Sequence, residues 1–146
     1  MLPDPYARKP PQTETRIPLG QLRRVVLCVD DDAAVLRMET LLLEESGKRV
    51  LASNDAKSAL ALFSGQWIDL AVIDYSMPEL NGAELARAMR RLKPEVPILM
   101  LSGQLEPPAG VSDEIDAYVS KGQQTSVLLN KIEELLNGTK NMAKRA

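Results

Sequence analysis

Short apolar runs alternate with longer amphipathic segments along most of the chain, and this alternation limits the folds that the chain can adopt. Five runs are rich in aliphatic residues and lack the polar alternation of a half-exposed strand. They lie at residues 24–29, 49–53, 70–73, 97–101 and 117–120. Strands of this kind, separated by helices, form a parallel sheet with helices on both faces. The sequence therefore predicts an α/β protein.

Helices are predicted between these strands from apolar residues that recur at helical spacing. In the first helix, Val35, Met38 and Leu42 form the apolar stripe, and Gly47 ends the helix. A last helix is predicted over residues 125–136.

The segment between the fourth and fifth predicted strands, SGQLEPPAGVSDEID, breaks this alternation. Pro107 and Pro108 cannot lie inside a helix, and Gly103 and Gly110 loosen the chain on both sides. We therefore expect the fourth helix of the fold to be short, with one or two turns around residues 111–116, or to be missing.

The whole pattern predicts one doubly wound domain. Because crossovers between parallel strands are right-handed, the possible topologies are a doubly wound sheet or a barrel. Five strands in about 115 residues are too few for the eight-stranded barrel. Half of the ten prolines fall within the first 20 residues, so residues 1–22 are expected to form an extended or disordered arm. The domain is expected over residues 23–137, and residues 138–146 are expected to form a flexible tail.

Composition and charge narrow the function. A net charge of −2 gives no reason to expect nucleic acid or an anionic membrane as a partner. The chain has no histidine, which excludes histidine general-base catalysis, the usual zinc sites and a phosphohistidine on this chain. The single cysteine, Cys28, lies in an apolar run and is expected to be a core residue. No segment has the features of a membrane span or a signal peptide, so we expect a cytoplasmic protein.

Polar side chains follow four of the predicted strands. They are Asp30, Asp31 and Asp32 after the first strand, Asp74 after the third, Ser102 after the fourth and Lys121 after the fifth. Because ligands of doubly wound sheets bind outside the carboxyl ends of the strands, these groups are expected to meet. Crowded carboxylates repel one another unless a cation lies among them, and hard oxygen ligands suit Mg²⁺ or Mn²⁺.

Asp74 stands at the end of a buried apolar strand, where an unpaired carboxylate would lose solvation. A metal ion and the Lys121 ammonium would neutralise it and leave one oxygen free as a nucleophile. Such a carboxylate can accept a phosphoryl group, with the developing charge shared by the metal, Lys121 and the Ser102 hydroxyl. Each residue alone also has an ordinary explanation as a helix cap, a turn residue or a surface lysine. Their coincidence at one end of four strands favours a site.

Four segments together, VVLCVDDD, VIDYSMPELNG, LMLSG and AYVSKG, resemble the receiver domain of two-component response regulators, the CheY-like family. The resemblance covers residues 23–137. It implies a flavodoxin-like sheet with the strand order 2-1-3-4-5. It also implies a phosphoacceptor signalling domain rather than an enzyme, since such a domain promotes only its own phosphorylation and dephosphorylation.

The resemblance assigns roles to single residues. Asp74 corresponds to the aspartate that is phosphorylated. Asp30 and Asp31 correspond to the acidic pair that holds Mg²⁺, together with Asp74 and the backbone carbonyl of Ser76. Pro78 and Gly82 correspond to the turn after the acceptor.

The resemblance also implies a switch. Lys121 corresponds to the lysine that contacts the phosphoryl group, Ser102 to the hydroxyl that moves toward it, and Tyr118 to the switch aromatic. Gly122 stands where the family usually has a proline, often after a cis bond, and a cis bond before glycine is not expected.

The implied mechanism needs a partner, because the phosphoryl group comes from the phosphohistidine of a histidine kinase or a histidine phosphotransfer protein. Too few residues follow Asn137 for a DNA-binding domain in this chain. We therefore expect a stand-alone receiver that acts through protein contacts. The sequence does not identify its downstream protein target.

Three other functions fit parts of the pattern. The main alternative is a metal-dependent phosphohydrolase with an aspartate nucleophile. It would need a cap over the substrate and a general acid two residues after Asp74, where this chain has Ser76. A flavin or nucleotide carrier would need a phosphate cradle after the first strand, where three acids stand. A receiver-like domain without phosphorylation is disfavoured by the complete set of acids.

Overall fold

A five-stranded parallel sheet runs through the centre of the computed structural model, in the order β2-β1-β3-β4-β5. The structure describes residues 22–145, so the predicted N-terminal arm, apart from Leu22, and Ala146 lie outside the described residues. The strands are β1 Val25–Val29, β2 Arg49–Ser53, β3 Leu70–Asp74, β4 Ile98–Ser102 and β5 Ala117–Ser120. The predicted doubly wound, flavodoxin-like fold and its strand order are confirmed.

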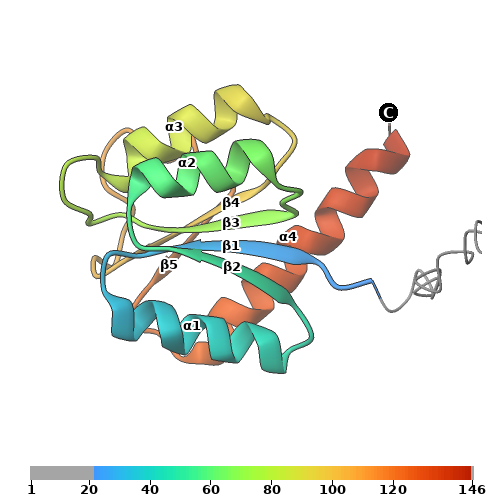
Figure 1. The fold of residues 1–146 in the computed structure, drawn as a ribbon, viewed down its shortest axis with the longest axis horizontal. Helices are drawn as coiled ribbons and strands as arrows, with labels where there is room; N and C mark the ends of the chain where they lie inside the picture. The colour runs from blue at the N-terminus through green and yellow to red at the C-terminus, as the bar shows by residue number, and fades with distance from the viewer. Residues whose placement is uncertain (1–21, 146) are drawn as a thin grey trace, which may run out of the picture.

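Helices cover both faces of the sheet (Figure 1). In the described part of the chain they are α1 Ala33–Glu45, α2 Ala56–Gly65, α3 Gly82–Leu92 and α4 Thr125–Arg145. Successive strand residues point to opposite faces, and each face has its own buried cluster. Phe63 of α2 and Met89 of α3 belong to one cluster, and Leu43 of α1 and Ile132 of α4 belong to the other.

The neighbouring strands β3 and β4 are buried along their whole length and end on polar side chains. Each extends one residue further than predicted, so that Asp74 and Ser102 belong to the strands. Asp74 pairs with Leu101, and Ser102 pairs with Ser120. Both polar groups are therefore held in the sheet at its carboxyl edge.

No helix forms between β4 and β5 in the structure described here, which confirms the prediction of a short or missing fourth helix. Residues 103–116 instead pass through two turns, with hydrogen bonds from Val111 N to Pro108 O (3.3 Å) and from Glu114 N to Val111 O (3.0 Å). The Val111 side chain is 1% exposed and belongs to the cluster under α2 and α3. Val111 thus supplies apolar contact that a helix would otherwise provide.

Helix α1 faces the sheet with a different stripe from the one predicted. Met38 is 55% exposed, whereas Glu39 and Leu43 are buried. Residues 41–43 are three successive leucines, so apolar side chains surround the helix on more than one side and the pattern does not define a single face. Gly47, with φ 87°, follows the helix as predicted.

Helix α4 continues past Leu136, where the sequence predicts its end, to Arg145. A glycine inside a helix costs only about 1 kcal/mol relative to alanine, and no proline follows Gly138. The residues predicted as a flexible tail are therefore helical up to Arg145, because polar composition alone does not stop a helix. None of the helices in the described residues combines the length and the apolar character that crossing a membrane requires.

Candidate functional site

The carboxylates of Asp30 and Asp74 share one ammonium group at the carboxyl edge of the sheet. Asp30 directly follows β1 and is 0% exposed, and Asp74 ends β3 and is 3% exposed. Lys121 follows β5, and its Nζ lies 3.0 Å from Asp30 Oδ2 and 2.9 Å from Asp74 Oδ1. The structure thus brings these three predicted residues together from three strands.

Asp31 adds a third acid to this group. One carboxylate oxygen from each of Asp30, Asp31 and Asp74 lies within 4.8 Å of the other two. Opposite ligands of Mg²⁺ lie about 4.2 Å apart, twice the usual magnesium–oxygen distance, so this spacing suits one hard divalent ion. Asp31 is exposed, which leaves room for water in the coordination. The donor set fits Mg²⁺ or Mn²⁺.

Asp32 has a structural role instead. Its Oδ1 accepts hydrogen bonds from the N–H groups of Ala34 (2.9 Å) and Val35 (3.3 Å) and so caps α1. Its own N–H donates to Asp30 Oδ1 at 2.9 Å, which orients the Asp30 carboxylate. The run of three acids therefore combines a helix cap with two candidate metal ligands.

The charges of the group do not balance. Burial raises the pKa of the Asp74 carboxyl; the hydrogen bond from Lys121 lowers it, and the charge of Asp30 raises it again. Burial lowers the pKa of the Lys121 ammonium, but hydrogen bonds to Asp74 and Asp30 outweigh this effect and leave that pKa above its ordinary value. One positive charge thus serves two buried carboxylates, and the excess negative charge is what a divalent ion would offset.

The backbone after Asp74 lies against both its carboxylate and the start of α3. The N–H of Ser76 donates to the Asp74 side chain, and the N–H of Gly82 donates to Tyr75 O at 2.8 Å. A Cβ atom at position 82 would lie 2.6 Å from Asp74 O and 2.7 Å from Tyr75 Cα. Glycine in the predicted turn therefore allows α3 to begin this close to the end of β3.

Ser102 and Tyr118 are connected through the backbone of Gln104. The Ser102 hydroxyl oxygen accepts a hydrogen bond from the Gln104 N–H at 3.2 Å, and the Gln104 carbonyl accepts one from the Tyr118 hydroxyl at 2.6 Å. The Lys121 N–H also donates to Ser102 O at 2.7 Å. The described peptide bonds include no cis bond, in agreement with the expectation for Gly122. Hydrogen bonds thus link the predicted switch residues Ser102 and Tyr118 through Gln104, and Ser102 to the backbone of Lys121.

Glu39 is a buried acid near the site that the sequence analysis does not predict. It is 4% exposed, and its Oε2 has no hydrogen-bond partner. Burial raises the pKa of Glu39 to about 7, with the charge of Asp30 adding to the increase and that of Lys121 opposing it. The signal that points to it is the spacing of Val35, Glu39 and Leu43, which lie four residues apart on one side of α1.

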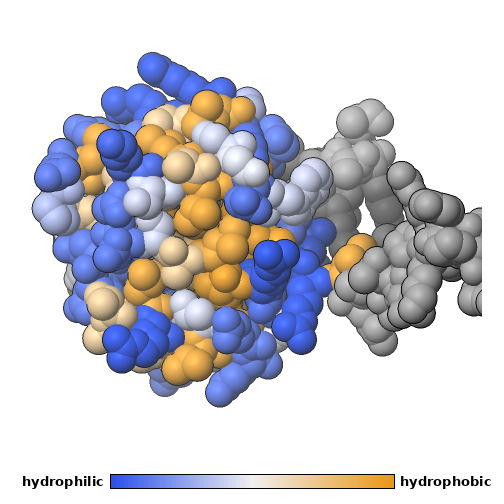
Figure 2. Space-filling view, viewed as in Figure 1, coloured by the Kyte–Doolittle hydropathy of each residue, from blue (hydrophilic) through white to orange (hydrophobic). Residues whose placement is uncertain are grey.

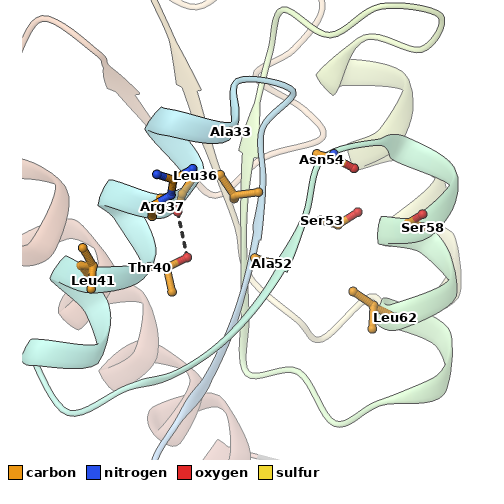
Figure 3. Close-up of a pocket in the computed structure, with 10 residues that line it drawn as sticks. All are labelled: Ala33, Leu36, Arg37, Thr40, Leu41, Ala52, Ser53, Asn54, Ser58 and Leu62. Carbon is orange, nitrogen blue, oxygen red and sulfur yellow. Dashed lines mark hydrogen bonds between the residues drawn. The ribbon is translucent and has the colours of Figure 1, made fainter.

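A separate groove of about 560 Å³ lies between α1 and α2 along the outer edge of β2 (Figure 3). Figure 2 shows apolar side chains gathered on this face of the molecule. Leu36, Leu41 and Leu62 line the groove together with polar residues such as Arg37 and Thr40. None of the predicted site residues lines it, so the groove is distinct from the predicted site.

Comparisons with known sequences agree with this geometry. A family model described as the response regulator receiver domain matches residues 26–133. The response regulator MprA of Mycobacterium leprae is 35% identical over 118 residues, which cover 79% of this chain and 52% of MprA. The chain spans only part of the curated relatives that it matches, 18% of the length of one of them and about half of MprA.

Solved structures lead to the same group of proteins. A receiver domain protein (CheY-like) from Methanospirillum hungatei matches with a TM-score of 0.77 at 28% identity, over 83% of this chain and 99% of that chain. The response regulator TrrA of Thermotoga maritima, solved in complex with Mg²⁺-BeF, matches with a TM-score of 0.73 at 26% identity. That match covers 77% of this chain and 98% of the TrrA chain.

Proposed function

The chain belongs to the response regulator receiver domain family, and on this premise we propose that Asp74 accepts a phosphoryl group from the phosphohistidine of a partner protein. The observation that carries the proposal is the Asp74 carboxylate, buried at a strand end, 2.9 Å from the Lys121 ammonium and beside two further acids. The chain itself has no histidine. We therefore expect the donor to be a cytoplasmic histidine kinase or histidine phosphotransfer protein.

The group of acids supports Mg²⁺ as the cofactor, with Mn²⁺ as a substitute. Asp30, Asp31 and Asp74 would hold the ion through carboxylate oxygens, and Ser76 through its backbone carbonyl. The similar protein TrrA was solved in complex with Mg²⁺-BeF, which is consistent with a divalent ion at this edge. When bound, the ion supplies positive charge that offsets both the carboxylates and the phosphoryl oxygens.

In the proposed transfer, an oxygen of the Asp74 carboxylate attacks the phosphorus atom of the donor phosphohistidine. The new P–O bond forms as the P–N bond breaks, and the electron pair of the P–N bond returns to the imidazole nitrogen. Lys121 has three N–H donors, of which two are directed to Asp30 and Asp74, so a third can bind a phosphoryl oxygen. Water later attacks phosphorus, which releases inorganic phosphate and restores the carboxylate.

We further propose that Ser102 and Tyr118 report the phosphorylated state. A phosphoryl group adds strong acceptor oxygens at Asp74, toward which the Ser102 hydroxyl would turn. The Gln104 N–H would then lose its acceptor, and the hydrogen bond between Tyr118 and Gln104 would weaken. The surface of β5 and of residues 103–116 would change, and a protein target rather than DNA would recognise that change.

The alternative of a metal-dependent phosphohydrolase has less support. Two residues after Asp74 is Ser76, whose hydroxyl cannot replace a carboxylic acid as a general acid at neutral pH. Turnover of p-nitrophenyl phosphate by the wild-type chain, lost in Asp74→Asn, would favour this alternative.

Acetyl phosphate with Mg²⁺, followed by measurement of the intact mass, tests the proposal directly. The wild-type chain should gain one phosphoryl group, whereas Asp74→Asn, and the wild-type chain in EDTA, should gain none. Asp113→Asn removes an exposed acid from the connection between β4 and β5 and should be labelled like the wild type. Equal labelling of Asp74→Asn and the wild type would overturn the assignment of Asp74.

A further inference from the structure

A cavity of about 210 Å³ lies between α1 and the start of α4, next to Lys121. Val35, Met38 and Leu42 of α1 and Leu128 of α4 provide apolar walls. Glu39 also lines the cavity. The phosphoryl transfer proposed above uses neither this cavity nor Glu39.

Glu39 is a buried carboxyl group with one oxygen that has no hydrogen-bond partner. Its side chain is 4% exposed, and Oε2 is the one buried side-chain oxygen or nitrogen within residues 22–138 that has no hydrogen-bond partner. Leaving such a group buried and unpaired is unfavourable. Lys121 borders the same cavity, but its ammonium is bound to Asp30 and Asp74. The described chain therefore places an unsatisfied acceptor beside a cavity with apolar walls, whose other lining residues include the polar Ser120, Gln123, Gln124 and Thr125.

The charges around Glu39 favour a cation. The groups that act on it electrostatically are the carboxylates of Asp30 and Asp74 and the single ammonium of Lys121. Cys28 on β1 also lies close enough to be affected by Glu39, and burial raises the pKa of its thiol, so it stays neutral. Without a divalent ion, and above about pH 7, where Glu39 is ionised, a positively charged group in the cavity would meet a net negative environment and an anion would be repelled.

We propose that this cavity binds a small primary amine with a compact apolar body, whose ammonium group donates a hydrogen bond to Glu39. An apolar cavity of about 150 Å³ holds one benzene ring, so a cavity of about 210 Å³ has room for one ring with a short amine-bearing arm. The apolar walls remove the ring from water. The ammonium group binds the carboxyl group of Glu39, which lines the cavity.

Three ring compounds of equal size, benzylamine, benzyl alcohol and benzoate, test the proposal on the full chain by calorimetry and thermal unfolding. Benzylamine should bind and raise the unfolding midpoint with its concentration, benzyl alcohol should bind several-fold more weakly, and benzoate should not bind. Glu39→Gln keeps the size of the side chain and should weaken benzylamine binding about tenfold. Glu44→Gln changes an exposed glutamate of the same helix and should bind like the wild type.

Equal affinity for benzylamine and benzyl alcohol, or equal benzylamine affinity in the wild type and Glu39→Gln, would overturn the proposal. A cavity occupied by water alone, with no amine binding at any soluble concentration, would overturn it as well. If Glu39→Gln does not fold, methyl NMR shifts of the wild type decide the question. Shifts induced by benzylamine at Val35, Leu42 and Leu128 support the site, and their absence there contradicts it.

Discussion

Asp30, Asp74 and Glu39 are three buried acids whose partners differ. Lys121 binds the carboxylates of Asp30 and Asp74, whereas Glu39 leaves Oε2 without a partner. Burial raises the pKa of Glu39 to about 7. Near neutral pH, Glu39 therefore exchanges a proton inside the folded protein, while in the unfolded chain it is already ionised.

Glu39 should make the folded protein less stable as the pH rises from about 4.5 to about 7. The unfolded chain releases the Glu39 proton near its ordinary pKa of 4.5, and the folded chain retains it until about pH 7. The folded state binds more protons in this window, so its free energy of unfolding falls with rising pH. The full effect is on the order of 3 kcal/mol. Urea unfolding in EDTA, from about pH 4 to about pH 8, measures it.

Glu39→Gln should lack this part of the pH dependence, because glutamine does not titrate. Glu44→Gln, on the exposed side of α1, should keep the wild-type profile. If the wild type and Glu39→Gln lose stability in parallel between pH 4.5 and 7, the pKa of Glu39 is not raised in the folded state.

Two connections place the elements of the site, the one between β3 and α3 and the one between β4 and β5. In the first, α3 begins against the end of β3, because a Cβ atom at Gly82 would lie 2.6 Å from Asp74 O. This contact involves the backbone of the proposed phosphate acceptor. The packing of α3 and the position of the Asp74 carboxylate are therefore linked.

Gly82→Ala should disturb both. The added methyl group meets backbone atoms rather than a flexible side chain, so we expect a loss of about 1–3 kcal/mol in the free energy of unfolding. The rate of labelling by acetyl phosphate should also fall, because Asp74 must shift. Gly65→Ala is the matched control, since a Cβ there has nothing within 4 Å, and it should change stability by less than about 1 kcal/mol. Unchanged stability and labelling in Gly82→Ala would contradict the link.

In the second connection, Arg90 of α3 binds the chain between β4 and β5. Its guanidinium donates to Asp116 Oδ2 at 2.6 Å. It also donates to three backbone carbonyls, those of Pro94, Val96 and Glu114. Asp116 Oδ2 in turn accepts a hydrogen bond from the Ile98 N–H at 2.8 Å. Arg90 thus joins α3, the start of β4 and the chain before β5.

Arg90→Ala should lower the free energy of unfolding by about 1–2 kcal/mol, mainly through the lost bonds to carbonyls. The ion pair with Asp116 contributes little, since the two side chains are 26% and 38% exposed. Hydrogen exchange should become faster over residues 109–116. Arg90→Lys should not restore the slower exchange of the wild type, because one ammonium cannot bind four acceptors. Arg91→Ala, at an exposed position, is the control, and equal exchange in both variants would refute the role of Arg90.

At the scale of the whole molecule, the sheet and the position of the site are predictable from the sequence. Apolar runs form β1 and most of β3 and β4, and parallel strands bring the residues at their carboxyl ends to one edge. Asp30, Asp74 and Lys121 meet there as predicted. Their roles in phosphoryl transfer stay predictions.

Other features were not predictable, because they depend on packing rather than on pattern. Three successive leucines at 41–43 hide which side of α1 faces the sheet. The residue type of Glu39 does not predict its burial either, since glutamate on an amphipathic helix is ordinarily exposed, and only its spacing from Val35 and Leu43 points to it. The bond between Tyr118 and Gln104 depends on the path of a loop, which local sequence does not determine.

Mg²⁺ should stabilise the whole fold, because its proposed ligands lie on different strands and meet only in the folded chain. Mg²⁺ at ten times its dissociation constant should add about 1.4 kcal/mol to the free energy of unfolding. This gain appears as a higher unfolding midpoint than in EDTA. Asp31→Asn alters an exposed ligand and should remove most of this rise, whereas Asp113→Asn should retain it. An equal rise in both variants would place the bound ion elsewhere.

The segment between β4 and β5 is anchored at both ends, by Ser102 and Tyr118 at Gln104 and by Arg90 at Asp116. The entropy of closing a loop grows slowly with its length, by about 0.6 kcal/mol for each doubling. Adding or deleting a few residues around 107–109 should therefore leave the folding equilibrium nearly unchanged. Evolution can vary the length of this stretch, and with it the choice of binding partner, without moving either anchor.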